Sequence, residues 1–570
     1  MEQSEQPIAE APPAATGVPN ARAWFGHPRG LATLFFTEMW ERFSYYGMRA
    51  LLILYMTKEL VEANPGLGYN TAKAGAVYGL YTGLVYLLAL PGGWVADNLW
   101  GQRRAVFVGG CIIAAGHFSM AAPILGLPEQ TFFFAGLILI VIGTGLLKPN
   151  VSTIVGELYP EGGARRDAGF SIFYMGINIG AIAGPTICSL LGENYNFHWG
   201  FSAAGFGMVL GLIQYRKTDR YLGDAGLLKG DSPASELSRR SRNFYVSLTA
   251  VVGAIVLFAW LVSSGVIAVT LEQVAMGLGH GIIMVTILFF AYLIFNWRWS
   301  AAFLALFAAA LAYFLGSGFL AADPGFDLAA QWASGLTLGV FLLTLVVLLV
   351  ARGTEVSLER RRLAVIFWLF LLAAVFWGGF EQAGSSLNIF ARDLTDRVVF
   401  GWEAPAGWLQ NINPIFIVLL APVFGSLWVG LAKRKANPSI PLKFALGLMG
   451  LAAGFFVLAW GAANATMENT VSPAWLVVTY FLHTCGELCL SPVGLSSMTK
   501  LAPRDRVGQM MGVWFIAAAL GNLFAGLVAG QLEELSHSTL FLIVGVSTLG
   551  VGILALLLSP LVRRVMGDVE

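Results

Sequence analysis

Charged residues are scarce in this sequence. Asp, Glu, Lys and Arg make up 12% of its 570 residues, whereas hydrophobic residues make up 57%. An ordinary soluble domain has about 25% charged residues, so this chain cannot cover an apolar core with a polar surface, and a water-soluble protein is excluded. The net charge of +1 is too small to attract nucleic acid, which excludes that class of partner as well. The shortage of charge indicates that this protein is surrounded by a lipid bilayer.

Cysteine and histidine are also rare, with four and six residues. The cysteines all lie in apolar runs, where small buried side chains are expected: Cys111, Cys188, Cys485 and Cys489. Their spacing predicts neither a disulfide framework nor a metal site. The chain also lacks HExxH and GxSxG motifs, which disfavours an enzyme and leaves no cofactor to expect.

Apolar runs near the length of a membrane-crossing helix, about 20 residues, recur along the chain. Six of them lie within residues 31–217 and six more within 352–562. A basic, polar linker, 218–243, follows the first group, and four further apolar runs lie within 244–351. We therefore expect an all-α polytopic membrane protein that consists of two six-helix bundles and an inserted set of two to four extra transmembrane helices.

Lys and Arg indicate which side of the membrane each loop occupies, because they concentrate in short cytoplasmic loops. Basic residues cluster in alternate loops, for example Arg103 with Arg104, Arg165 with Arg166, and Arg563 with Arg564. Both termini are then expected in the cytoplasm. Residues 1–30 are expected to form a disordered tail, since they lack the apolar core of a signal peptide, and residues 563–570 a short tail. The two bundles share one orientation in the cell membrane, which is typical of a parallel repeat with the substrate site between its halves.

The first span contains a cluster of charges at Glu38, Glu41 and Arg42. A charged side chain at the centre of a membrane helix costs roughly 2.5–3.5 kcal/mol, so such a cluster needs an explanation. Burial favours the neutral form of a carboxyl group, and a nearby guanidinium favours its ionised form. Competition between the two carboxylates for Arg42 could therefore drive proton exchange. The alternative is a static ion-pair network that fixes helix packing.

Other charges in the apolar runs differ in sign between the two halves. Arg42, Arg49 and Lys148 come from the first six spans, whereas Glu381 and Glu487 come from the last six. A cleft with cations on one wall and carboxylates on the other suits a zwitterion that has both a carboxylate and an amine. Without ligand, Arg49 or Lys148 could pair with Glu381 and hold one end closed, which makes Lys148 and Glu381 candidate gating residues. A lysine that extends to the membrane interface is the alternative for Lys148.

Aromatic and amide side chains in the spans are candidates for the walls of this cleft, although each could equally serve helix packing. They are Tyr45, Tyr46, Tyr86, Trp377, Trp514, Asn178 and Asn413.

A glycine-containing turn, Pro91-Gly-Gly-Trp-Val-Ala-Asp97, follows the second span and leads to Gly101-Gln-Arg103. Asp97 could accept hydrogen bonds from a neighbouring helix end or from Arg103, in a link that breaks and reforms as the halves move. A purely structural turn is the alternative. The pattern resembles the loop signature of the major facilitator superfamily.

Together these motifs resemble the proton-dependent oligopeptide transporter (POT) family of that superfamily. The match includes Glu38-x-x-Glu41-Arg42-Phe43-x-Tyr45-Tyr46-Gly47, Phe173-Tyr174-x-x-x-Asn178-x-Gly180, Lys148-Pro149-Asn150, Phe380-Glu381-Gln382 and Gly486-Glu487-Leu488. The resemblance implies proton-coupled uptake of di- and tripeptides by alternating access, with protons as the coupling ion and a monomer as the expected state. One departure is the insert, because bacterial members usually have two extra helices where this chain has four apolar runs.

The resemblance also implies a role for each candidate residue. Proton coupling would involve Glu38, Glu41, Arg42 and Glu381, and Arg42, Arg49 and Lys148 would serve the peptide carboxylate or gating. The amino end of the peptide would meet Glu487, Asn178 and Asn413, and Tyr45, Tyr46, Tyr86 and Trp514 would line the cavity. A family member that carries another solute, such as nitrate or a peptide-like compound, is the alternative. A carboxylate at Glu487 disfavours a simple anion.

Overall fold

The computed structural model describes residues 24–567 apart from 62, 162, 229–233, 296–356 and 504. Within these ranges the chain is almost entirely helical, and the one sheet is a hairpin of β1 (Val398–Val399) and β2 (Trp402–Glu403). The last two apolar runs of the insert, near 299–320 and 331–351, lie outside the described residues. Whether the insert crosses the membrane two or four times therefore remains a prediction.

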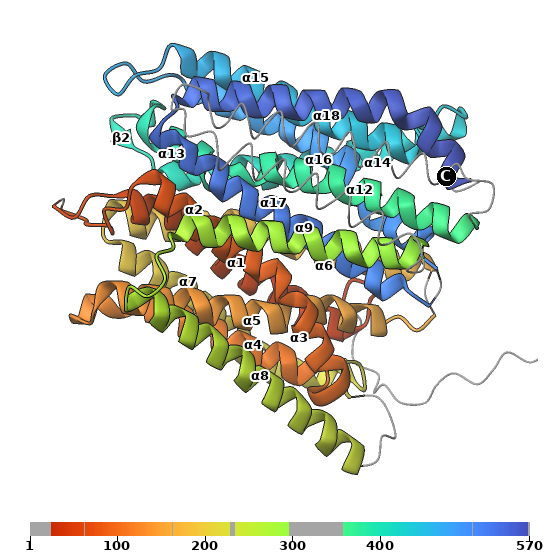
Figure 1. Cartoon of the computed structure of the whole chain (residues 1–570). Helices are drawn as coiled ribbons and strands as arrows, with labels where there is room; N and C mark the ends of the chain where they lie inside the picture. Colours follow the sequence, from red (N-terminus) through yellow and green to blue (C-terminus); the bar gives the residue numbers. More distant parts are fainter. Residues whose placement is uncertain are drawn as a thin grey trace, which may run out of the picture.

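The N-terminal bundle is the lower group of helices in Figure 1. It comprises α1 (Arg29–Thr57), α2 (Thr71–Leu87), α3 (Ala89–Val95), η1 (Ala96–Trp100), α4 (Gln102–Ala121), η2 (Ala122–Leu125), α5 (Glu129–Glu157), α6 (Gly163–Asn194), α7 (Phe197–Thr218) and η3 (Asp219–Leu222). Helix α1 packs along α6 and α7, and α4 packs along α5. Helices α2, α3 and η1 together form the second span.

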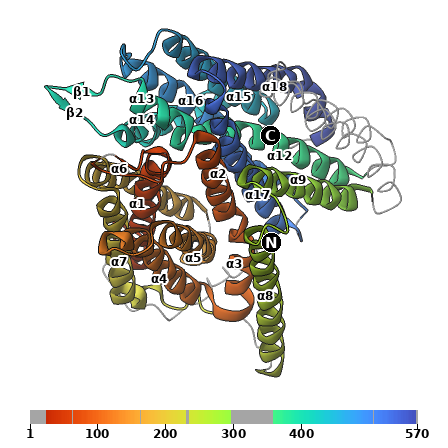
Figure 2. The same cartoon turned by 60° about the vertical axis from the view of Figure 1, so that its left-hand side comes forward.

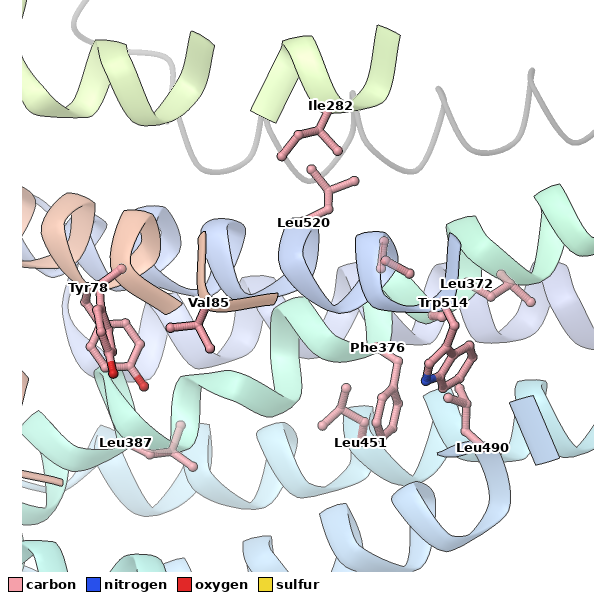
Figure 3. Packing of buried hydrophobic residues seen from close by; sticks show 14 of the residues in the cluster. Tyr78, Val85, Ile282, Leu372, Phe376, Leu387, Leu451, Leu490, Trp514 and Leu520 are labelled. Carbon is pink, nitrogen blue, oxygen red and sulfur yellow. The ribbon is translucent and has the colours of Figure 1, made fainter. Parts of the chain in front are cut away.

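The C-terminal bundle is the upper group in Figure 1. It comprises α12 (Leu358–Phe380), η4 (Glu381–Gly384), α13 (Ser386–Asp393), η5 (Ala406–Asn411), α14 (Ile412–Lys433), α15 (Ile440–Ala463), α16 (Ala474–Leu501), α17 (Val507–Gly530), η6 (Gln531–Glu533) and α18 (His537–Met566). Figure 3 shows part of its apolar core, in which Phe376, Leu451, Leu490 and Trp514 belong to one cluster.

Two helices of the insert are described, α8 (Ala234–Ser263) and α9 (Leu271–Phe295). Helix α8 stands apart from both bundles in Figure 2, and its apolar segment is unburied. Helix α9 packs against α2 and α17, where the two halves meet. Helix α8 begins within the expected linker and α18 continues past the expected end at 562. Arg and Lys are good helix formers, so these helices extend into their basic flanks.

Twelve helical segments of the described chain are long and apolar enough to cross a membrane. Helices α1 and α7 are also long, with 29 and 22 residues, but contain charged and polar side chains. Both pack within the N-terminal bundle, with α7 against α1 and α4. The expected all-α polytopic architecture is confirmed.

The two halves meet along two seams, and in each the second span of one half contacts the fifth span of the other. In the first seam α2 packs on α17 through glycines. A Cβ atom on Gly526 would collide with the carbonyl oxygen of Gly75 and the amide of Gly79, so the backbones touch directly. In the second seam α6 packs on η5 and α14. We call the end of the molecule that contains the β1–β2 hairpin, at the left of Figure 1, the hairpin end.

Candidate functional site

The charged cluster of α1 is fully enclosed by the N-terminal bundle. The Nε atom of Arg42 lies 3.0 Å from a carboxylate oxygen of Glu38 and 2.5 Å from one of Glu41. None of the three side chains is more than 6% exposed. Residues three and four positions apart lie on one face, which brings Glu38 close to Glu41 and Arg42, whereas Glu41 directly precedes Arg42 and is reached by the long arginine side chain. The guanidinium of Arg42 is therefore shared between two buried carboxylates.

Two glycines bring α6 close to this cluster. A Cβ atom on Gly180 would clash with the carbonyl oxygen of Met39 and would lie 2.8 Å from the Cβ of Arg42. A Cβ atom on Gly47 would lie 2.5 Å from the sulfur of Cys188 on α6. The glycines of the first-helix and fifth-helix motifs thus have a physical reason, because only hydrogen fits between the two helices at these points.

Arg49, two turns further along α1, joins the two halves. Its Nη2 atom lies 2.8 Å from Oε2 of Glu381, and its Nε donates a hydrogen bond of 2.8 Å to the hydroxyl of Tyr78 on α2. Both side chains of the ion pair are at most 7% exposed. Glu381 reaches Arg49 from η4, where the seventh span is interrupted, and a Cβ atom on Gly384 would collide with the Tyr78 hydroxyl.

Lys148 lies half-buried on α5. Its ammonium nitrogen is 3.7 Å from the ring centroid of Tyr86, which is within the range of a cation–π interaction. It also interacts electrostatically with Glu38, Glu41 and Glu381. The ion pair with Glu381, for which Lys148 and Arg49 were both candidates, is made by Arg49.

Glu487 and Asn413 lie together in the C-terminal half. The Asn413 amide donates hydrogen bonds of 3.2 Å to Oε2 of Glu487 and 3.0 Å to the hydroxyl of Thr484. Tyr46 and Tyr174 of the N-terminal half interact electrostatically with Glu487. The hydrogen bond to Glu487, however, is made within the C-terminal half, by Asn413.

The predicted aromatic residues differ in exposure. The rings of Tyr45 and Tyr46 are 5.2 Å apart, and Tyr45 is almost fully buried. Trp377 is half-buried and packs edge-on against Phe376. Trp514 is 6% exposed and packs against Gly494, among the core residues of Figure 3. Their roles in binding remain predictions.

Asn178 and Arg103 have partners other than those considered from the sequence. The Asn178 amide donates to the Tyr174 carbonyl of its own helix at 3.0 Å. Asp97 accepts a hydrogen bond of 2.7 Å from the Gln102 amide, whereas Arg103 donates to the carbonyl of Ala225 at 2.6 Å. Asp97 is therefore bonded to the first residue of α4, the neighbouring helix end, and Arg103 instead contacts the loop after η3.

Sequence reasoning missed Tyr78 and the polar contacts between the halves at the hairpin end. Among these, Asn388 of α13 donates to the carbonyl of Ala50 at 2.8 Å, and Arg392 donates to the hydroxyl of Thr57 at 2.7 Å. These side chains lie near span ends, where polar residues are common and give no signal. Within the described ranges, no group of His, Cys, Asp and Glu residues is arranged to hold a metal ion.

The bundles and the buried charges that they share define an all-helical membrane transporter rather than an enzyme. Residues 103–238 and 334–546 match the profile of the POT family. The peptide transporter YePEPT of Yersinia enterocolitica is 39% identical over 569 residues, which cover 98% of each chain. The di-/tripeptide transporter of Lactococcus lactis subsp. cremoris is 35% identical and covers 96% of this chain and 98% of its own.

Solved structures of peptide transporters and POT family members are also similar to this chain. A peptide transporter POT in complex with alafosfalin superposes with a TM-score of 0.75 at 36% identity, over 97% of this chain and 98% of its own. A POT family transporter in complex with 5-aminolevulinic acid has a TM-score of 0.72 at 30% identity, over 96% and 99%. The chain belongs to the POT family, and its resemblance to that family is confirmed.

Proposed function

We propose that this protein is a proton-coupled symporter that imports di- and tripeptides by alternating access. The observation that carries the proposal is the set of buried charges in the two halves. Arg49 pairs with Glu381 across the interface. Arg42 pairs with Glu38 and Glu41 in the N-terminal half, and Glu487 lies beside Asn413 in the C-terminal half. Relatives at 39% and 35% identity that are named peptide and di-/tripeptide transporters support the same substrate class.

A peptide has a carboxylate at one end and an amine at the other, and the site offers a complementary group to each. Lys148 and Arg42 would attract the carboxylate, and Glu487 with the oxygen of Asn413 would receive the ammonium group. Tyr46, Tyr86 and the remaining predicted aromatic residues would contact side chains of varied size without strict shape requirements.

The charges around Arg42 give a reason for coupling to protons. Glu38 and Glu41 contribute two negative charges, and Arg42 and Lys148 contribute two positive ones, so the ionised group is neutral overall. One bound proton makes the group net positive, which attracts the peptide carboxylate. Conversely, a bound carboxylate favours proton uptake, and by linkage each ligand strengthens the binding of the other. Glu381 would take part through its pair with Arg49.

Further parts of the proposal concern topology. Both termini would face the cytoplasm, with residues 1–30 and 563–570 as tails, and the hairpin end would face outward. The units 31–217 and 352–562 would move against each other, and the insert over 244–351 would lie outside the transport path. The protein would act as a monomer.

Uptake of a radiolabelled dipeptide into proteoliposomes tests the proposal. A pH gradient or a membrane potential should drive accumulation, and accumulation that ignores both would refute symport. Glu41→Gln should abolish uphill uptake but retain counterflow exchange, because exchange needs no net proton movement. Unchanged uphill uptake would show that Glu41 is not a coupling residue.

A second candidate is transport of a small peptide-like zwitterion. It is supported by the relative in complex with 5-aminolevulinic acid, since that compound also has an amine and a carboxylate. Uptake of labelled 5-aminolevulinic acid, measured beside that of the labelled dipeptide, separates the candidates, whereas a simple anion such as nitrate should compete with neither at a site that contains Glu487.

A further inference from the structure

Glu193, at the end of α6, caps a helix of the opposite half. Its Oε2 accepts a hydrogen bond of 2.7 Å from the amide of Ala406, and its Oε1 accepts one of 3.0 Å from the amide of Gly407. Ala406 begins η5, and the N-cap residue Pro405 provides no side-chain acceptor. The carboxylate from the N-terminal half therefore takes the place of a local cap.

Glu533, at the end of η6 in the C-terminal half, caps a helix of the N-terminal half. Its Oε2 accepts a hydrogen bond of 3.0 Å from the amide of Thr71, the first residue of α2. The local cap Asn70 accepts from Lys73 and leaves the Thr71 amide without a partner in its own half. A carboxylate of the C-terminal half therefore completes the cap of a helix in the N-terminal half.

These two contacts occupy equivalent places in the two halves. Glu193 lies three positions before Asn196, the N-cap of α7, and Glu533 lies three positions before Ser536, the N-cap of α18. In both cases the carboxylate lies at the C-terminal end of the fifth span and accepts a hydrogen bond from the first amide of the second span of the other half. The repeat thus places one carboxylate on each seam at the hairpin end.

We infer that Glu193 and Glu533 form a paired latch that holds the hairpin end closed. A carboxylate at a helix N-terminus is stabilised by the exposed amides and by the helix dipole. Donor and acceptor belong to different halves, so both contacts must break when this end opens. Glu193 makes two bonds and is half-buried, whereas Glu533 makes one and is exposed, so Glu193 contributes more. The inference rests on the proposed alternating access.

Distances between spin labels at the hairpin end test the latch. Labels at Val61→Cys in the α1–α2 loop and Met467→Cys in the α15–α16 loop would report on the separation of the halves, because both positions are exposed. The four native cysteines are replaced by alanine, and the protein is studied without peptide in lipid nanodiscs. Glu193→Ala should raise the ratio of long to short distances about tenfold, Glu533→Ala by less, and the double variant by about the product.

Glu534→Gln provides the control, because it removes a negative charge next to Glu533 without removing the acceptor of Thr71. It should leave the distance distribution unchanged. All variants are also measured with Glu381→Gln, which removes the ion pair between the halves and is expected to populate the open form, so that small increments become visible. If Glu193→Ala with Glu533→Ala matches the control in both backgrounds, the latch is refuted. The distance measurement needs no peptide, so its outcome is independent of the uptake assay. Unchanged distances would refute the latch even if dipeptide uptake is observed, and changed distances would support the latch even if it is not.

Discussion

The ion pair between Arg49 and Glu381 is the buried contact that most directly joins the halves, and its removal gives a quantitative prediction. Glu381→Gln keeps the shape of the side chain but removes its charge. Arg49 would then be left at the interface, 5% exposed, with a hydrogen bond to the Tyr78 hydroxyl and the ring of Tyr46 as its remaining neighbours. The state that is closed at the hairpin end must bear this unpaired charge, whereas water would solvate Arg49 once that end opens.

The magnitude follows from the burial of the pair. Removing one partner of a buried ion pair costs about 3–5 kcal/mol, because the other charge is left uncompensated. The hydrogen bond from Arg49 to Tyr78 remains, so we take the lower end of about 3 kcal/mol. The ratio of open to closed hairpin ends should rise roughly a hundredfold.

Thiol labelling at Ser189 measures this ratio. Ser189 on α6 is fully buried and packs directly against Gly407 of η5. In a protein without native cysteines, Ser189→Cys should react with a bulky maleimide only when the hairpin end opens. Because labelling then follows the open population, Glu381→Gln should increase its initial rate by about two orders of magnitude.

Glu403→Gln serves as the matched control. Glu403 also lies at the hairpin end and pairs with Arg397 at 2.6 Å, but both residues belong to the C-terminal half. Its loss should leave the labelling rate unchanged. Equal rates in Glu381→Gln and the parent protein would refute the reasoning, because the ion pair would then contribute nothing to closure.

Two further changes test the site and the seam. Glu487→Gln should raise KM for a dipeptide about tenfold or more, because a charge-assisted hydrogen bond to the amine is lost. The affinity for an N-acetylated dipeptide inhibitor, which has no free amine, should stay the same. Competition assays measure both ligands, and equal weakening of the two would argue against an amine site. Gly526→Ala should lower the free energy of unfolding by about 1–3 kcal/mol, because its Cβ collides with the backbone of α2. Thermal unfolding measures this loss, with Gly508→Ala as the control at an open position, and equal melting temperatures would contradict the close contact.

The sequence predicted the helices well because apolar run length alone determines a span. It missed the β1–β2 hairpin, whose turn places Phe400 and Gly401 at positive φ values of 52° and 80°. Phenylalanine gives no signal for that conformation, so the turn was not predictable. The start of α8 at Ala234 and the end of α18 at Met566 also lie outside the expected bounds of the spans. Basic residues are compatible with both a helix and a polar tail, so they do not mark where a helix ends.

The site was predictable to the extent that it lies within one helix. Glu38, Glu41 and Arg42 meet because they lie within little more than one turn of a single helix, where the long arginine side chain reaches both carboxylates. Glu381 pairs with Arg49 and not with Lys148. Which of the two cations it meets depends on how the bundles dock, and residue spacing in the sequence does not show this. The partners of Glu193 are backbone amides, and these have no residue signature at all. Only a comparison of the two halves, through the caps of α7 and α18, could have indicated that carboxylate.

The amides that Glu193 and Glu533 bind have a consequence for variation of the chain. A backbone donor belongs to no particular side chain, so the hydrogen bonds of Thr71 and Ala406 survive any side-chain exchange that the surrounding packing admits. Proline is the exception, because it has no N–H group to donate. A mutational scan would therefore find Thr71 tolerant to most side chains but sensitive to proline, whereas Ala406, which is fully buried, would accept only small residues other than proline. Sensitivity to proline at both positions is the pattern that identifies a helix contact made by the main chain itself.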